Sequence, residues 1–410
     1  MEMDDFTQLV QSVNGLLWGM YCLIPLLVGT GIYLTIKLRF IQIRRFGQAF
    51  RKVFGGITLF GDKAGKDGMS SFQSLATAIS AQVGTGNLAG VATAIAMGGP
   101  GAIFWMWLAA FFGMATIFAE ATLAQVFRAR DAHGQIMGGP AFYISRGLHN
   151  KPLAAFFAVS IIIALGFIGN MVQANSIADG FHKAFEIPQW ATGIFVFAIA
   201  GFIFIGGVRR IASFAEKMVP LMAVVYILGS LTIIFSNYDM ILPAFKEIIV
   251  GAFDPSAGTG GIIGASLKEA IRYGVARGLF SNEAGMGSTP HAHALAQVKH
   301  PCEQGLVAYV GLFFDTFIVL NVTPLVILTT GVLDGKSTGI VLTQAAFTAG
   351  LGDIRPGFVA ICLFFFAFTT IVGWYFFGEQ NVKYLLGLRW VQSYRVLVLC
   401  FLMLGSFLHV

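Results

Sequence analysis

The chain has 410 residues, of which 56% are hydrophobic and 11% are charged, and its formal net charge is +6. Soluble domains carry about 25% charged residues, so this composition excludes a soluble protein and indicates an integral membrane protein. The four cysteines show no Cys-x-x-Cys spacing and therefore indicate neither a disulfide framework nor a metal site.

Ten apolar segments are long enough to cross a bilayer as helices, which takes roughly 20 residues each. In chain order we expect these spans at 13–36, 70–98, 101–127, 153–181, 189–206, 213–236, 263–292, 305–332, 357–378 and 394–410. The sequence therefore predicts one transmembrane domain over 1–410 and no soluble domain. Its acidic start, from Met1 to Asp5, is unlike the basic start of a cleavable signal peptide.

The basic residues are distributed unevenly between the loops. Most of the 26 Lys and Arg residues lie in loops on one side of the predicted spans, beginning with the loop from Lys37 to Lys52. Such an excess is typical of cytoplasmic loops, so we expect the N-terminus outside. The net charge then reflects topology rather than nucleic-acid binding. The stretch 37–56 mixes basic with aromatic and aliphatic residues, which favours a helix on the inner membrane surface; an ordinary basic loop is the alternative.

The span 70–98 is interrupted at Gly84-Thr85-Gly86-Asn87 by residues that helices tolerate poorly. Backbone that leaves helical geometry inside a bilayer survives only where it lines a cavity or binds a ligand. A half-helix that begins near Gly86 directs free N–H groups toward a carboxylate, and one that ends near Val83 directs carbonyls toward a cation. The pattern predicts a site for a zwitterion and a cation such as Na⁺; a glycine-mediated helix contact is the alternative.

The seventh span is interrupted in the same way, by the run Ser-Asn-Glu-Ala-Gly-Met-Gly that begins at Ser281. Glu283 is an intramembrane carboxylate with Arg277 as its expected partner. It is either a direct ligand or a structural acceptor that holds the break open. His291 and His293 are two residues apart, which places them on different faces of a helix, and we expect them at a solvated helix end.

The two broken spans enter the membrane from opposite sides, with four unbroken spans between them. Matched breaks in antiparallel halves are typical of a transporter built as an inverted repeat with its site at the midplane. We expect a first repeat over 70–236 and a second over 263–410, preceded by an extra helix at 13–36. Because the second repeat counts only four spans, we expect one more helix after Val410; a native four-helix second half is the alternative.

Further polar or amphipathic side chains stand in otherwise apolar spans. They are Glu120, Gln173, Asn175, Asp315, Thr369, Thr370 and Trp374. The adjacent threonine hydroxyls can complete an oxygen cage for Na⁺ with carbonyls of the first break, whereas Mg²⁺ or Ca²⁺ would need more carboxylates. The sequence has no phosphate-binding loop, nucleophile elbow or zinc-protease motif, so neither an enzyme nor an ATP-driven pump is indicated.

The stretches Gly84–Ile95, Gly98–Trp107 and Arg277–Pro290 closely resemble the alanine or glycine:cation symporter family, the bacterial sodium:alanine symporters. The resemblance runs from the first span to Trp374 and beyond, and the run Gly-Leu-Phe-Ser-Asn-Glu-Ala-Gly-Met-Gly-Ser at 278–288 is its most specific part. It implies a fold similar to the bacterial leucine transporter, with five plus five helices in an inverted repeat and an added N-terminal helix. It also implies a location in the bacterial plasma (inner) membrane.

The resemblance also implies roles for individual residues. The amides of Thr85 and Gly86 in the unwound first helix would hold the substrate carboxylate. A sodium site would be formed by two carbonyls and two hydroxyls, those of Ser80, Val83, Thr369 and Thr370. Asn87 corresponds to a side chain that contacts a second sodium ion in the leucine transporter, and whether this family uses that ion is left open.

The leading interpretation is a symporter that couples inward Na⁺ movement to uptake of alanine or glycine by alternating access. We expect a small substrate pocket lined by Gly84, Thr85, Gly86, Asn87, Gln173, Asn282, Gly285, Met286 and Trp374. Glu283 and Arg277 are expected to act in gating or in structure. The alternatives are a proton-coupled carrier, in which Glu283 or Asp315 titrates, and an uncoupled channel or receptor-like relative.

Overall fold

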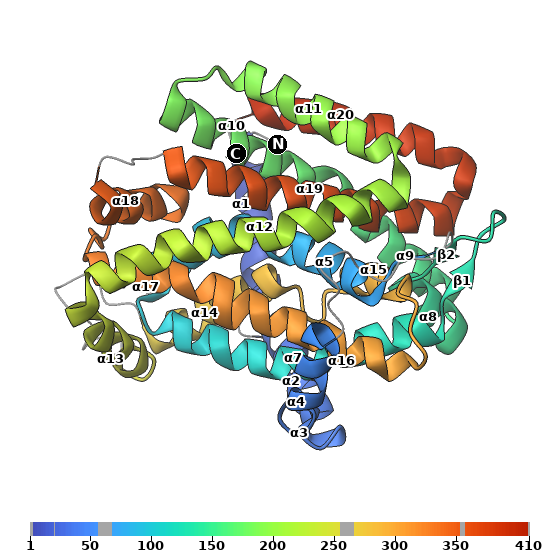
Figure 1. Ribbon diagram of the computed structural model, residues 1–410, viewed down its shortest axis with the longest axis horizontal. Helices are drawn as coiled ribbons and strands as arrows, with labels where there is room; N and C mark the ends of the chain where they lie inside the picture. Colours follow the sequence, from blue (N-terminus) through green and yellow to red (C-terminus); the bar gives the residue numbers. More distant parts are fainter. Residues whose placement is uncertain (1–2, 20, 56–67, 255–265, 353–356, 409–410) are drawn as a thin grey trace.

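Helices account for nearly all the secondary structure (Figure 1). The computed structural model describes residues 3–19, 21–55, 68–254, 266–352 and 357–408. Within these ranges the single sheet is a short antiparallel hairpin of β1 (Ala129–Arg130) and β2 (Ile136–Met137). The expectation of an all-α protein is confirmed.

In the described part of the chain, six helices are long and apolar enough to cross a membrane. They are α7 (Ala102–Val126), Lys151–Phe185, α12 (Gly207–Ser236), Pro301–Thr330, α19 (Gly357–Leu386) and Leu388–Phe407, the last of which joins η8 (Leu388–Trp390) to α20 (Val391–Phe407). Each coincides with a span expected from the sequence. The chain is therefore a multi-pass membrane protein.

Two of these long helices contain π-helical turns. One runs through α9 (Lys151–Ile161), η2 (Ile162–Gly169) and α10 (Asn170–Phe185). The other runs through α16 (Pro301–Phe313), η6 (Phe314–Leu320) and α17 (Asn321–Thr330). Such turns occur frequently at functional sites.

Shorter helices complete the fold. They are α1 (Met3–Leu17), α2 (Leu23–Lys37), α3 (Ile41–Arg44), α4 (Phe46–Phe54), α8 (Pro140–Gly147), α11 (Gln189–Ile205), η3 (Tyr238–Met240), α13 (Ile241–Gly251) and α18 (Gly339–Leu351). In Figure 1, α11 and α20 pack together along one edge and α3 and α4 project from the opposite edge. The helices α5 (Ser71–Gln82), α12 and α19 lie between these edges.

The expected first span at 13–36 is wrong as a single helix. It includes the end of α1 and most of α2, which are separate helices of 15 residues each. At 1.5 Å per residue, α2 is about 22 Å long and falls short of the roughly 30 Å hydrocarbon core. The helices α13 and α18 were not expected, because their 11 and 13 residues are also too few to span.

The stretch 37–56 is helical in its described part, up to residue 55, rather than an ordinary loop. The aromatic side of α4 packs on the middle of the long helix Pro301–Thr330. The Phe46 ring centroid lies 5.0 Å from that of Phe313, and the Phe50 centroid lies 6.3 Å from that of Phe314. Its position on the inner membrane surface stays a prediction.

Both expected breaks are present. The helix α5 (Ser71–Gln82) gives way to η1 (Gly86–Gly90) and α6 (Val91–Gly98), and α14 (Leu267–Asn282) gives way to α15 (Pro290–Ala294). The two broken segments are neighbours, because α14 contacts η1 and α6, and α15 contacts α5. Residues 263–265 of the expected seventh span and 409–410 of the last lie outside the described residues.

Candidate functional site

The first break brings the end of α5 against α19. A side-chain carbon on Gly84 would lie 2.5 Å from the Thr370 hydroxyl oxygen, closer than any real contact, so only glycine fits there. Val83, at the end of α5, has φ −81° and ψ 85°, which is outside the helical region. The chain therefore leaves the helix at Val83 and turns beside Thr370.

Several oxygens converge on the Thr370 hydroxyl. Its Oγ1 lies 3.1 Å from the carbonyl oxygen of Ser80, 3.4 Å from that of Ala81, 3.5 Å from that of Val83 and 3.0 Å from that of Phe366. A hydroxyl has one proton and can donate to one of these carbonyls at a time. The remaining acceptors form a neutral oxygen set of the kind that suits a monovalent cation. Thr370 is fully buried.

Thr369 does not join this oxygen set. Its Oγ1 lies 3.0 Å from the carbonyl oxygen of Phe366 and 3.4 Å from the sulfur of Met222 on α12. Successive residues of a helix are about 100° apart, so only one of two adjacent threonines can face α5. The structure brings together Ser80, Val83 and Thr370 from the expected sodium ligands and leaves Thr369 outside.

Asn87 connects the two breaks. Its Oδ1 accepts hydrogen bonds from the amide of Gly84 at 3.1 Å and from the Ser281 hydroxyl at 3.3 Å. Its Nδ2 donates to Asp315 Oδ1 at 2.8 Å. The breaks approach closely here, because a side-chain carbon on Gly86 would lie 3.2 Å from the Ser281 Cα. Asn87 therefore fixes the distance between the breaks and ties both to the π-helical turn η6.

Gln173 on α10 faces the first break. Its Nε2 donates to the Thr85 hydroxyl at 3.1 Å. Its Oε1 is buried and has no hydrogen-bond partner among the described residues. A buried carbonyl without a donor is costly in free energy, and an ammonium group would satisfy it. The Gln173 side chain, bonded to Thr85, therefore places a free carbonyl acceptor beside the first break.

In the second break, three alternate residues have backbone angles in the left-handed region. Glu283 has φ 57°, Gly285 φ 81° and Gly287 φ 77°. Asn282 caps the turn, since its Oδ1 accepts from the Ala284 amide at 3.1 Å. The last residue of α5, Gln82, donates its Nε2 to the Asn282 carbonyl oxygen at 2.6 Å, so the first break supports the second directly.

Glu120 on α7, to which the sequence assigned no role, holds the second break open. Its Oε2 accepts from the Gly285 amide and its Oε1 from the Gly287 amide, each at 3.1 Å. This is the role that the structural interpretation of the sequence gave to Glu283. Glu283 instead accepts from Trp374 Nε1 at 2.7 Å and from the Ser288 hydroxyl at 2.5 Å. The one available sequence signal for Glu120 was a carboxylate in an apolar span.

The expected partnership between Arg277 and Glu283 is not present. Among the described residues the hydrogen bonds to the Glu283 carboxylate come from Ser288 and Trp374. Arg277 instead lines a cavity of about 350 Å³ at the junction of α1 and α14, formed with Asn14, Trp18, Arg272, Tyr273, Ala276 and Phe280. The two residues are six positions apart on the chain and their side chains leave the helix in different directions.

His291 and His293 are buried rather than solvated, so that expectation is wrong. His291 stacks between Phe157 and Phe377, and its Nε2 lies 2.8 Å from the Asn381 amide nitrogen. The Nδ1 of His293 lies 2.8 Å from the amide nitrogen of Gln304. Side chains of α9, α16 and α19 contact the two rings, and no local sequence pattern revealed these contacts.

Three of the expected pocket residues, Gly285, Met286 and Trp374, contact different parts of the structure from one another. The Cα of Gly285 faces Leu27 of α2 and Thr116 of α7, and Met286 donates its amide to the Glu283 carbonyl oxygen at 3.1 Å. Trp374 packs against the π-helical turn η2, because a side-chain carbon on Gly169 would lie 2.6 Å from its ring. Trp374 therefore forms a fixed wall near Gln173, and Gly285 lies on the side of the loop toward α2.

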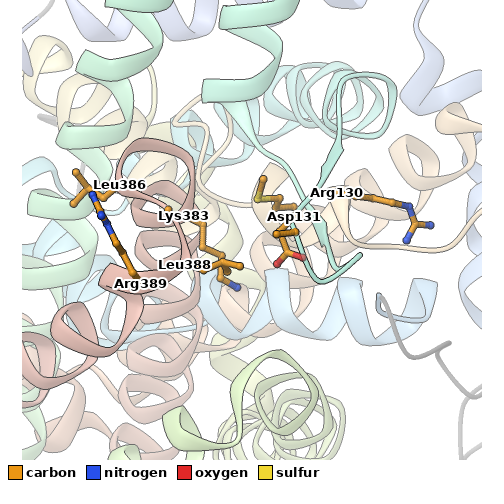
Figure 2. Close-up of a pocket in the computed structure, with 9 residues that line it drawn as sticks. Arg130, Asp131, Lys383, Leu386, Leu388 and Arg389 are labelled. Atoms are coloured by element: carbon orange, nitrogen blue, oxygen red, sulfur yellow. The ribbon is translucent and has the colours of Figure 1, made fainter.

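A cavity of about 510 Å³ lies away from the breaks, between the β-hairpin and the end of α19 (Figure 2). Its lining residues include Arg130, Asp131, Lys383, Leu386, Leu388 and Arg389. In Figure 2, Lys383 and Asp131 lie near the middle and the two arginine head groups point outward. The Lys383 Nζ is already paired with Glu379 at 2.7 Å, so its charge is satisfied within α19.

Comparison with known proteins identifies the family. The model of the sodium:alanine symporter family matches residues 3–410. The sodium/alanine symporter AgcS of Methanococcus maripaludis is 43% identical over 400 residues, which cover 96% of this chain and 86% of that protein. The putative sodium/proton-dependent alanine carrier protein YrbD of Bacillus subtilis is 44% identical over 92% of this chain and 78% of its own length.

A further relative is named for a different substrate. The probable sodium/glutamine symporter GlnT of Bacillus subtilis is 39% identical over 97% of this chain and 81% of its own length. The matches extend over the whole helical body that carries the two breaks. The chain belongs to the sodium:alanine symporter family, a family of cation-dependent amino-acid transporters and not of enzymes.

Proposed function

We propose that this protein couples inward movement of Na⁺ to uptake of a small neutral amino acid, alanine or glycine, by alternating access. Family membership supports a cation-dependent amino-acid symporter. The finer proposal rests on one observation. The carbonyl oxygens of Ser80, Ala81 and Val83 and the hydroxyl of Thr370 converge next to a break whose other half can bind a carboxylate.

The substrate would lie between the two half-helices of the first break. The amides of Thr85 and Gly86 stand at the start of η1, where N–H groups have no preceding turn to bond, and this favours a carboxylate. The free Oε1 of Gln173 would accept the ammonium group. Opposite charges on the two ends of a zwitterion are thereby matched without any charged side chain.

The proposed preference for small side chains rests on Trp374. Its indole Nε1 is fixed by Glu283 and its ring by the close approach of Gly169. Discrimination between substrates by apolar fit alone is about 1–3 kcal/mol, so serine would compete weakly with alanine. Because the relative GlnT is named as a probable sodium/glutamine symporter, glutamine has to be included among the competitors in the test.

The test is uptake of radiolabelled alanine into proteoliposomes, with and without an inward Na⁺ gradient. We expect concentrative uptake that needs Na⁺ and is inhibited by glycine but not by leucine or phenylalanine. Uptake without accumulation would identify an uncoupled channel. Strong inhibition by glutamine would move the substrate class toward larger amides.

Proton coupling is the second candidate, and the relative YrbD is named as a putative sodium/proton-dependent carrier. The observation that favours it is the burial of Glu120, Glu283 and Asp315, none of which forms an ion pair with Lys or Arg in the part of the chain that the structure describes. A buried carboxylate needs a cation or a proton nearby. A proton carrier would respond to pH and to ionophores but not to replacement of Na⁺.

We further propose the membrane arrangement. The repeats would cover 70–236 and 263–410 as an inverted pair, in the inner membrane, with the N-terminus outside and the basic loops in the cytoplasm. The antiparallel entry of the two broken helices and the distribution of Lys and Arg support this. Labelling of single cysteines from either face, in the loops near Arg44 and near Asp334, tests it.

A further inference from the structure

A carboxylate at the inner end of the bundle holds the start of α5. The Gln73 side chain donates its Nε2 to Glu216 Oε2 on α12 at 3.0 Å. The same side chain closes the cap of α5, because its Oε1 accepts from the Ser70 amide at 3.1 Å. One glutamine therefore both caps α5 and ties it to α12, at the end of the molecule that carries the basic loops.

A polar stripe connects this contact with the Thr370 oxygen set. Gln73, Thr77 and Ser80 are spaced by four and three residues, so they lie on one face of α5. Thr77 and Ser80 are fully buried. The stripe begins where the Ser80 carbonyl oxygen lies 3.1 Å from Thr370 Oγ1 and ends at the Glu216 carboxylate.

Gln380 on α19 is a further buried polar side chain. Both its amide oxygen and its amide nitrogen are buried without a partner in the described chain. It is seven residues after Gly373, whose Cα faces Ser80 and Ala81. Seven residues are about two turns, so Gln380 lies on the same side of α19 as Gly373 and about 10 Å further along the helix. An unpaired buried amide at this position points to water or an ion between the helices.

Glu216 is able to exchange its partner. Within the described ranges its one hydrogen bond comes from Gln73, and neither Lys nor Arg pairs with it. A carboxylate attracts a cation more strongly than it attracts a neutral amide. A cation that reaches this carboxylate would therefore compete directly with Gln73.

We propose that Glu216 is an inner, transient site for the coupling monovalent cation, occupied after the ion leaves the Thr370 oxygen set. The arriving ion displaces Gln73 from the carboxylate, which frees the start of α5 from α12 and opens the inner end. Ion release and opening are then one event. The inference rests on the proposed function and adds a second binding position to its ion path.

The test compares the Na⁺ dependence of alanine uptake from the two faces. Inside-out membrane vesicles expose the inner face to the medium, and right-side-out vesicles expose the outer face. For Glu216→Gln we expect the half-saturating Na⁺ concentration to rise about tenfold in inside-out vesicles and to stay unchanged in right-side-out vesicles. Glu216→Asp keeps the charge and should restore most of the inner Na⁺ affinity. Lys217→Gln, an exposed neighbour on α12, is the matched control.

The variant Gln73→Ala distinguishes a cation-binding role of Glu216 from a purely structural contact between Gln73 and Glu216. It removes the competitor but keeps the carboxylate, so the inner half-saturating Na⁺ concentration should not rise. If Gln73→Ala raises it as Glu216→Gln does, the pair is only a structural contact and the inference is overturned. It is also overturned if Glu216→Gln leaves the inner value unchanged. Absence of any Na⁺ response in the wild-type protein would instead refute the proposed function.

Discussion

Glu120→Gln is the sharpest perturbation of the second break. The carboxylate accepts two amide hydrogen bonds of 3.1 Å, from Gly285 and Gly287. A bond to a charged acceptor contributes about 1.5–3 kcal/mol. Glutamine keeps one acceptor oxygen but turns an NH₂ group toward the other amide, so one of the two bonds is lost and a buried donor is left unpaired.

The neutral side chain also removes the desolvation cost of a buried carboxylate, which offsets part of that loss. We therefore expect the conformation with the open break to be destabilised by about 2 kcal/mol, which corresponds to a shift of about 30-fold in the populations of the conformers. The maximal rate of alanine uptake should fall, and the stabilisation of the purified protein by alanine should weaken, while insertion into the membrane persists.

The assay is uptake in proteoliposomes together with thermal melting in detergent, with and without alanine. Asp239→Asn, which neutralises an exposed carboxylate outside the breaks, is the control and should behave as the wild type. If Glu120→Gln keeps the wild-type uptake rate and the wild-type response to alanine, the two amide bonds do not shape the site and the reasoning is refuted.

Five further substitutions test the first break and its neighbours. Thr370→Val removes a ligand oxygen and should weaken apparent Na⁺ affinity by about tenfold, whereas Thr369→Val should not; equal effects in a Na⁺ titration would contradict the assignment. Gly84→Ala should abolish uptake while the protein still reaches the membrane, because its methyl group would overlap the Thr370 hydroxyl; normal uptake would show that α19 can yield. Asn87→Asp should lose uptake, since its donor to Asp315 becomes a second carboxylate; retained transport would remove Asn87 from the site. Glu283→Gln should keep Na⁺-driven uptake at a lower maximal rate, and loss of net uptake with intact alanine exchange would favour proton coupling.

Sequence alone determined the features that depend on local composition. Apolar runs of about 20 residues predicted the six long helices, because a bilayer fixes the length that a helix needs. The breaks at Gly84 and Glu283 were also readable, since clusters of glycine and polar residues interrupt apolar runs there, and backbone that leaves the helix inside a membrane must line a cavity or a site. The position of the first break also indicated free carbonyls near Val83, because a helix end leaves its last carbonyls unbonded. The choice of Ser80 and Val83 as ligands came from the family resemblance.

The tertiary structure decided everything that depends on which helix faces which. Thr369 and Thr370 have the same chemistry and adjacent positions, and only the packing of α19 selects Thr370 for the carbonyls of α5. Glu120 reaches Gly285 across more than 160 residues of chain, so no local pattern could assign it to the second break. The burial of His291 has the same origin. Local sequence sets where a helix can form or must end, whereas the partner of a side chain is set by contacts between segments distant in the chain.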